Sequence, residues 1–271
     1  MNAASFFLKN PIFRYEDFAT WKMKRGTSNP LSITSAIQHY LKTGRLLRLR
    51  RGVFAVIPPG ETHDNVVIDP YLLSAKTAKD SILAYHSALD LYGLSYSAFE
   101  QFTFLTHQKI KPFEFREQWF QPVSIPTVLE KKGVETFATQ TIDRLGMDIK
   151  ITSVERTYVD ILDRVELCGG WEEVCRSIDN IVVLDIDIVI EYCLMLGNAT
   201  LAAKVGYFLE QRTGAFTVPF EKLSKLEQVK PRAPQYIMDR HREKSHLVSK
   251  WNLMIPISIL NKTWEEPNHD V

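Results

Sequence analysis

Two neighbouring segments near the start of the chain carry side chains that suit hydrogen bonding to a polyanion. In the first segment, the polar side chains recur at helical spacing and include no acid: Thr34, Ser35, Gln38, His39 and Lys42. The second segment follows at once and holds four arginines: Arg45, Arg48, Arg50 and Arg51. Neutral polar groups can bond to base edges in the major groove of DNA, and arginines can reach phosphates or an adjacent minor groove.

A helix is expected to position the first set. At ~100° per residue, the apolar residues between Leu31 and Thr43 fall in one sector and the polar ones in the opposite sector. Asn29-Pro30 predicts the start of this helix, because Asn can cap it and Pro suits the first helical position. Gly44 predicts its end.

A hairpin is expected to position the arginines. Leu47 and Leu49 alternate with Arg48 and Arg50, which is the period of a half-buried strand. Arg51-Gly52 predicts a tight turn, and the following segment, 53–57, predicts the returning strand.

Another helix, at 15–25, precedes these elements, and Pro58-Pro59-Gly60 predicts a linker after them. A helix, a polar-faced helix and a basic hairpin follow one another in the order of a winged helix-turn-helix. We therefore expect residues 1–60 to form a DNA-binding domain of this type.

The charge distribution agrees with this expectation. The chain has 271 residues and a formal net charge of +1. Residues 1–60 hold ten Lys/Arg and two Asp/Glu, a net charge of +8, whereas residues 61–220 carry −9 and residues 221–271 carry +2. The neutral total is thus a cancellation, and only the first segment is expected to meet nucleic acid.

The remaining chain, 61–271, is expected to form a mixed α/β domain with a small sheet and a helical segment, which makes the fold class α+β. Residues 70–94 have a helical pattern. Short β-like runs follow between residues 101 and 151, among them Val134–Ala138. Further helices are predicted at 154–164, 171–181, 186–196 and 199–212, with Gly214 ending the last.

Two other groups of residues have the types that catalysis uses. His86-Ser87 could serve as a base and a nucleophile, but adjacent helical residues point about 100° apart, so a packing role for His86 is favoured. Glu155, Asp160 and Asp163 could bind a divalent metal in a nuclease. Because Arg156 and Asp160 have the spacing of a helical ion pair, a salt-bridged helix face is favoured, and we expect no enzyme activity and no cofactor.

Cysteine use and hydropathy indicate the compartment. Cys168, Cys175 and Cys193 show no metal-ligand spacing and are expected to be reduced and partly buried. No apolar run approaches the ~18 residues of a membrane span, and the N-terminus lacks the apolar run of a signal peptide. A cytoplasmic protein without a membrane partner is therefore expected.

Several stretches, in this order along the chain, resemble the AbiEi-type antitoxin family of transcriptional regulators. They are Leu41–Leu46 with Arg51–Ala55, Ala84–Leu94, Val154–Arg164, Gly169-Gly170, Gly197–Ala199 and Gly206–Glu210. The resemblance covers roughly residues 5–215. It implies an antitoxin of a type IV toxin–antitoxin (abortive infection) operon, which represses its own promoter by binding inverted repeats in double-stranded DNA.

The resemblance further implies that the C-terminal region opposes a nucleotidyltransferase-like toxin without forming a stable complex with it. Two alternatives stay open from the residues alone. One is a metal-dependent nucleic-acid enzyme that uses Glu155, Asp160 and Asp163. The other is a protein-interaction module in which the acidic region 61–220 docks a basic partner.

Overall fold

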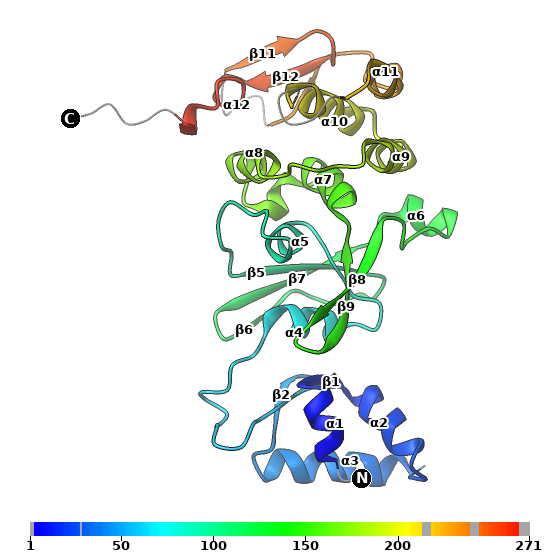
Figure 1. Ribbon diagram of the computed structural model, residues 1–271, viewed down its shortest axis with the longest axis vertical. Helices are drawn as coiled ribbons and strands as arrows, with labels where there is room; N and C mark the ends of the chain where they lie inside the picture. The colour runs from blue at the N-terminus through cyan, green and yellow to red at the C-terminus, as the bar shows by residue number, and fades with distance from the viewer. Residues whose placement is uncertain (1–2, 28, 213–217, 239–243, 266–271) are drawn as a thin grey trace, which may run out of the picture. The chain divides into compact units, whose positions relative to one another are not determined.

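The computed structural model describes residues 3–27, 29–212, 218–238 and 244–265, so the predicted helix stop at Gly214 lies outside these ranges. The fold is mixed α+β, with several small sheets and many helices (Figure 1). The chain divides into two compact units. Unit 1 comprises Met1–Leu83, Glu100–Ser124 and Gln140–Ile151, and unit 2 comprises Ala84–Phe99, Ile125–Thr139 and Thr152–Val271.

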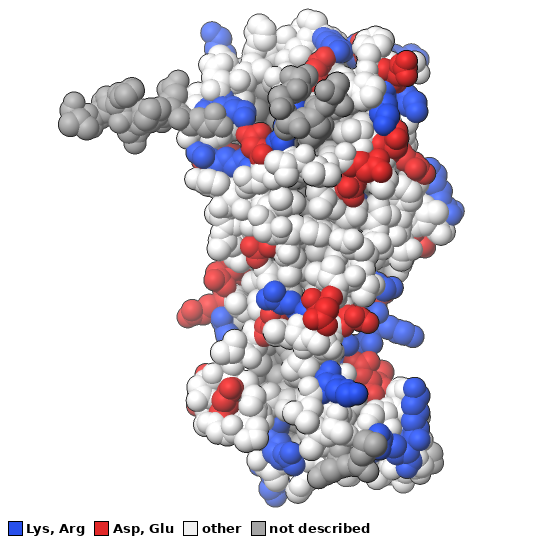
Figure 2. Space-filling view, in the orientation of Figure 1, with Lys and Arg blue, Asp and Glu red and all other residues white. Residues whose placement is uncertain are grey.

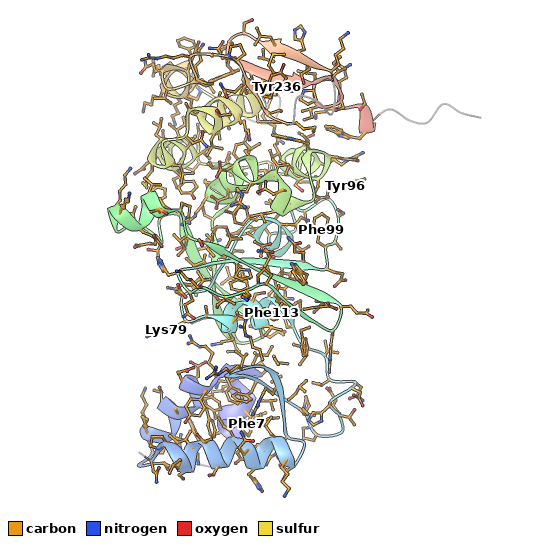
Figure 3. The ribbon with its side chains drawn as sticks, turned by 180° about the vertical axis from the view of Figure 1, so that it is seen from behind. Phe7, Lys79, Tyr96, Phe99, Phe113 and Tyr236 are labelled. Atoms are coloured by element: carbon orange, nitrogen blue, oxygen red, sulfur yellow. The ribbon has the colours of Figure 1, made fainter. Side chains whose placement is uncertain are left out.

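The first part of unit 1, residues 3–57, is called the head below. It consists of α1 (Ala4–Lys9), β1 (Ile12–Arg14), α2 (Tyr15–Met23), α3 (Pro30–Lys42), β2 (Leu46–Arg50) and β3 (Val53–Val56). The three strands form an antiparallel sheet in the order β1-β3-β2. Its core is aromatic, and Phe7, inside the head in Figure 3, packs with Phe13, Phe18 and Ile33.

The rest of unit 1 contains α4 (Pro70–Thr77) and, apart from the end residues Thr139 and Thr152, a six-stranded mixed sheet in the order β6-β7-β5-β4-β9-β8. The strands are β4 (Ile82–Leu83), β5 (Gln101–Thr106), β6 (Phe113–Phe115), β7 (Gln118–Ser124), β8 (Thr139–Arg144) and β9 (Met147–Thr152). The pairs β5–β7 and β4–β9 are parallel, whereas β4–β5 and β6–β7 are antiparallel. Short strands between residues 101 and 151 agree with the sequence prediction for this segment.

Unit 2 is largely helical. Its helices are α5 (His86–Leu91), α6 (Thr127–Lys132), α7 (Val154–Asp163), α8 (Trp171–Asp179), α9 (Ile186–Leu196), α10 (Ala199–Gln211), α11 (Phe220–Gln228) and α12 (Ile257–Leu260). Short 3-10 helices lie at Val165–Cys168 and Thr263–Glu265. A small sheet has the order β10-β12-β11, with β10 (Gln235–Tyr236), β11 (Ser245–Val248) and β12 (Leu253–Pro256).

The prediction of one long helix over residues 70–94 is wrong between Thr77 and His86. The chain leaves the helix after Thr77, forms β4 and re-enters a helix at His86. The Asp80 carboxylate fixes this break, because it accepts hydrogen bonds from the Thr106 hydroxyl (2.8 Å) and the His107 amide (2.7 Å) at the end of β5. Burial of β4 between two strands outweighs its local helical pattern.

The strand predicted at Val134–Ala138 is also wrong, since these residues form turns before β8 begins. The Arg156 guanidinium donates to the carbonyl oxygens of Glu135 and Phe137, both at 2.8 Å. These carbonyls therefore accept hydrogen bonds from a buried arginine and not from a neighbouring strand.

The segment that follows the expected linker at Pro58–Gly60 forms hydrogen bonds with other parts of unit 1. The Arg116 guanidinium donates to the carbonyls of His63 and Val66, and the His63 ring lies 3.2 Å from the Leu46 carbonyl. The head is accordingly grouped with the six-stranded sheet in unit 1, and the predicted boundary at residue 60 stays a prediction.

Candidate nucleic-acid interface

Local sequence signals define both ends of α3. The Asn29 side chain accepts from the Leu31 amide at 2.9 Å, and Pro30 occupies the first turn. At the other end Gly44 has φ +70°, and the amide of Arg45 donates to the Tyr40 carbonyl at 2.9 Å. This pairing belongs to a Schellman motif, a cap of the helix C-terminus. The Asn29 cap and this motif confirm the predicted start and end of the helix.

One face of α3 is exposed and polar. Ile33 and Ile37 are buried in the core of the head. The predicted contact residues are all accessible on the helix: Thr34, Ser35, Gln38, His39 and Lys42. Figure 1 shows α3 along the outer edge of the head, with α1 and α2 on its inner side. The structure thus brings the five residues together on one accessible face.

The segment that follows α3 carries three exposed arginines. Arg48 lies opposite Phe54 in the ladder, and Arg51 lies at the turn, where Gly52 has φ +79°. Arg45 precedes β2, and its guanidinium carbon lies 5.5 Å from the centroid of the Tyr40 ring. The head thus presents a polar helix face and, on the segment that follows it, three accessible cations.

Arg50 differs from these three arginines. A bulge in β2 between Arg48 and Arg50 interrupts the two-residue alternation that the sequence predicts. Leu49 is buried, as the alternation predicts, but Arg50 is only half exposed. Its guanidinium carbon lies 4.3 Å from the ring centroid of Phe113, labelled in Figure 3. Burial lowers the pKa of Arg50 from its ordinary value. Arg50 therefore packs against β6 of unit 1, and we do not count it among the accessible cations of the head.

We expect Arg50→Ala to lower the free energy of unfolding and to leave the affinity for DNA unchanged. Removal of a partly desolvated stack on Phe113 is expected to cost about 1–2 kcal/mol in the free energy of unfolding. Urea unfolding measures this cost, and a binding titration of the same variant should keep the wild-type salt dependence. A normal free energy of unfolding with a weakened salt dependence would return Arg50 to the interface.

Of the two acids of the head, Asp17 is paired with cations and Glu16 is exposed near the hairpin arginines. Asp17 forms a salt bridge with Arg14 (3.0 Å) and lies 3.8 Å from Lys76. Burial alone would raise the pKa of Asp17, but hydrogen bonds from Arg14 outweigh it and the pKa is lowered. Glu16 is exposed in a shallow hollow that Arg48 and Arg51 also line. Figure 2 shows Lys and Arg side chains at the lower end of the view, where Figure 1 draws α2 and α3.

Two further cations of the head were not among the residues predicted from the sequence. Lys24 and Arg25 are exposed between α2 and α3, and the Arg25 guanidinium carbon lies 4.6 Å from the centroid of the Trp21 ring. Both residues contribute to the basic count of residues 1–60, which was the available signal. Their position before the N-terminus of α3 suits contact with phosphates.

A solved structure shares this fold. The chain is similar to the crystal structure of the RV2827C protein from Mycobacterium tuberculosis, with a TM-score of 0.62 and 18% sequence identity. The match covers 97% of this chain and 94% of that one. At this identity, the likeness shows the fold alone. No family model matches the chain, and no curated protein sequence matches it either.

The acids of the alternative metal site do not form a cluster. Asp160 is buried, lies 3.5 Å from Arg156 Nε and accepts a hydrogen bond from the Tyr192 hydroxyl at 2.7 Å. Glu155 accepts from the Asp185 amide at 3.4 Å, and Asp163 accepts from Asn198 at 3.5 Å. Among the described residues, no three His, Cys, Asp or Glu side chains are grouped to hold a metal ion.

His86 is a packed residue. Its ring is stacked on Phe99 with centroids 3.9 Å apart, and its Nε2 lies 3.2 Å from a Glu173 carboxylate oxygen. Burial lowers the pKa of His86 despite this carboxylate. Glu173 also accepts from the amides of Tyr96 (2.9 Å) and Ser97 (3.1 Å), so the pair holds the loop that follows α5. These contacts give His86 the packing and hydrogen-bonding environment that the sequence favoured.

The three cysteines are buried. Burial raises the pKa of Cys168, and it raises the pKa of Cys193 to about 12. The thiols of Cys168 and Cys193 are therefore poorly reactive at neutral pH. Within the described ranges, no helix is both long enough and apolar enough to cross a membrane.

Because the Asp160 carboxyl titrates, the free energy of unfolding is expected to fall as the pH rises. Burial raises the pKa of Asp160 from 3.8 to about 6, so between these values the folded chain holds a proton that the unfolded chain has released. The stabilising contribution is complete below pH 3.8 and disappears as the pH rises through about 6. The difference corresponds to about 3 kcal/mol.

Asp160→Asn cannot titrate, so it isolates this effect. Urea unfolding of both proteins at pH 4 to 7 should show the wild type losing stability relative to the variant as the pH rises. A stability difference that stays constant over this range would contradict the raised pKa.

Proposed function

We propose that this protein binds double-stranded DNA through α3 and the β2–β3 hairpin, and that it represses transcription from its own promoter. The observation that carries the proposal is the exposed, acid-free polar face of α3, followed directly by the exposed Arg45, Arg48 and Arg51. The element order α1-β1-α2-α3-β2-β3 and the strand order β1-β3-β2 support the interpretation of the head as a winged helix-turn-helix.

In this proposal α3 enters the major groove. Gln38 is suited to a bidentate contact with adenine, and Ser35 and Thr34 can bond to either kind of base edge. The Thr34 hydroxyl lies 3.2 Å from the Tyr15 hydroxyl, which connects the second turn of α3 to the start of α2. Such a tie holds Thr34 in one orientation and leaves Ser35 and Gln38 as the more adaptable contacts.

The hairpin and the α2–α3 turn supply phosphate contacts. Arg48 and Arg51 lie on the hairpin, and Lys24 and Arg25 lie on the turn before α3. These cations fix the register of the helix on the duplex, whereas the neutral α3 face supplies the sequence preference. Repulsion between the acidic remainder of the chain and the phosphates favours contact through the head alone.

The resemblance to AbiEi-type antitoxins extends the proposal to an operon. The DNA target would be inverted repeats in the promoter, and unit 2 would oppose a nucleotidyltransferase-like toxin without a stable complex. A repressor of this kind acts in the cytoplasm. This part of the proposal rests on the stretches quoted from the sequence.

A competition titration tests the DNA-binding proposal. A labelled duplex from the region upstream of the gene is bound by the full chain and displaced by unlabelled duplexes of upstream or unrelated sequence. A specific repressor is expected to prefer the upstream duplex by about 10³-fold or more. In Gln38→Ala this preference should fall by about tenfold, because one base contact is removed. Equal displacement by both duplexes would refute sequence-specific binding.

A further inference from the structure

An apolar side chain lies in the middle of the polar face of α3. Leu31 is 76% exposed in the first turn of this helix. At ~100° per residue, it is aligned with Ser35, Gln38 and Lys42, and not with the buried Ile33 and Ile37. The core of the head therefore does not account for a leucine at this position.

The backbone at Leu31 is held in place. The Leu31 amide donates to the Asn29 side chain at 2.9 Å, and Pro30 fixes the preceding backbone angle. A leucine side chain has no hydrogen-bonding group, so it can recognise a base only through an apolar contact. In the major groove, the apolar group that bases present is the C5-methyl of thymine.

From this placement, and resting on the proposed binding of α3 in the major groove, we infer that Leu31 is a specificity-determining residue that contacts thymine methyl groups. The N-terminal residues of a recognition helix are the ones that reach base edges. Leu31 thereby selects thymine at one or two positions next to those read by Ser35 and Gln38. Replacing thymine by uracil removes the methyl group and keeps the base pairing, so it isolates this contact.

The test uses the upstream duplex prepared in two forms, one with thymine and one with uracil throughout, and titrates the full chain by fluorescence anisotropy. Wild-type protein should bind the uracil duplex about fourfold more weakly for each thymine methyl group that Leu31 buries in the thymine duplex. Leu31→Ala should bind the thymine duplex more weakly than wild type and should bind both duplexes with nearly equal affinity.

Leu8→Ala is the matched control, because Leu8 is a leucine of the head that is 86% exposed and belongs to α1 and not to α3. This variant should keep the wild-type ratio between the two duplexes. A wild-type ratio in Leu31→Ala would overturn the inference. If that ratio is unchanged and DNA-free Leu31→Ala also has a changed sedimentation coefficient, Leu31 contacts a second copy of the chain and not DNA.

The two proposals fail in different ways. If wild-type protein binds both duplexes tightly and equally, the thymine contact is refuted and DNA binding stands. If wild-type protein binds neither duplex, DNA binding itself is refuted, and the thymine contact with it.

Discussion

An Arg48→Ala/Arg51→Ala double variant is expected to bind the upstream duplex about 100-fold more weakly than the wild type at about 0.15 M salt. Both guanidinium groups are exposed on the β2–β3 hairpin. A hydrogen bond to a charged group contributes about 1.5 kcal/mol or more, so the removal of two phosphate-binding groups corresponds to about 3 kcal/mol. A titration repeated over a range of salt concentrations measures the change.

The salt dependence distinguishes the removal of phosphate-binding groups from a damaged fold. Each neutralised phosphate contributes about 0.9 to the slope of log affinity against log salt, so the double variant should have a slope shallower by about 2. Lys131→Ala/Lys225→Ala is the matched control, because it removes two surface charges that lie on α6 and α11. A wild-type affinity and slope in the hairpin variant would refute the role of the hairpin.

Arg156→Met is expected to lower the free energy of unfolding by about 3–5 kcal/mol at pH 7, the largest stability effect that we predict for a single substitution. Arg156 is fully buried in α7 beside the buried Asp160, and it also holds the carbonyls of Glu135 and Phe137. Its removal leaves a buried carboxylate without its cation and frees two acceptors that it had satisfied.

Urea unfolding of single and double variants checks this account. In Arg156→Met/Asp160→Asn, part of the stability should be recovered, because no charge remains at either of the two buried positions. Arg164→Met is the control, since its partner Glu166 is exposed and such a pair contributes less than about 1 kcal/mol. If Arg156→Met costs no more than the control, the buried network has no structural role.

The polar helix face could be predicted from the sequence because its determinants are local. Asn29, Pro30 and Gly44 lie at the ends of α3, and helical periodicity alone separates Ile33 and Ile37 from the exposed residues between them. The start of α7 is also fixed by a local contact, since the Ser153 side chain accepts a hydrogen bond from the Arg156 amide at 3.3 Å. Such signals involve residues within one or two helical turns.

Contacts between distant segments decided what the sequence could not predict. Arg50 is not exposed like the neighbouring arginines, because β2 has a bulge at this point and because the Arg50 guanidinium packs on the ring of Phe113, which is distant in the sequence. The segment 78–85 leaves the helix because Asp80 binds the end of β5 and β4 completes the sheet. In neither case does a Gly or Pro mark the change.

The central claim, that α3 lies in the major groove of its target, is tested most directly by cleavage of DNA from a probe on Ser35. Because Cys168, Cys175 and Cys193 are buried, Ser35→Cys gives the full chain one exposed thiol on α3 for a DNA-cleaving iron chelate. We predict cuts confined to a few base pairs in each half of the protected site, with the strand offset of major-groove attack. The same reagent on Lys225→Cys, in α11, should give no such pattern. Uniform cleavage along the duplex from the α3 probe, or cuts identical to those of the control, would contradict the account.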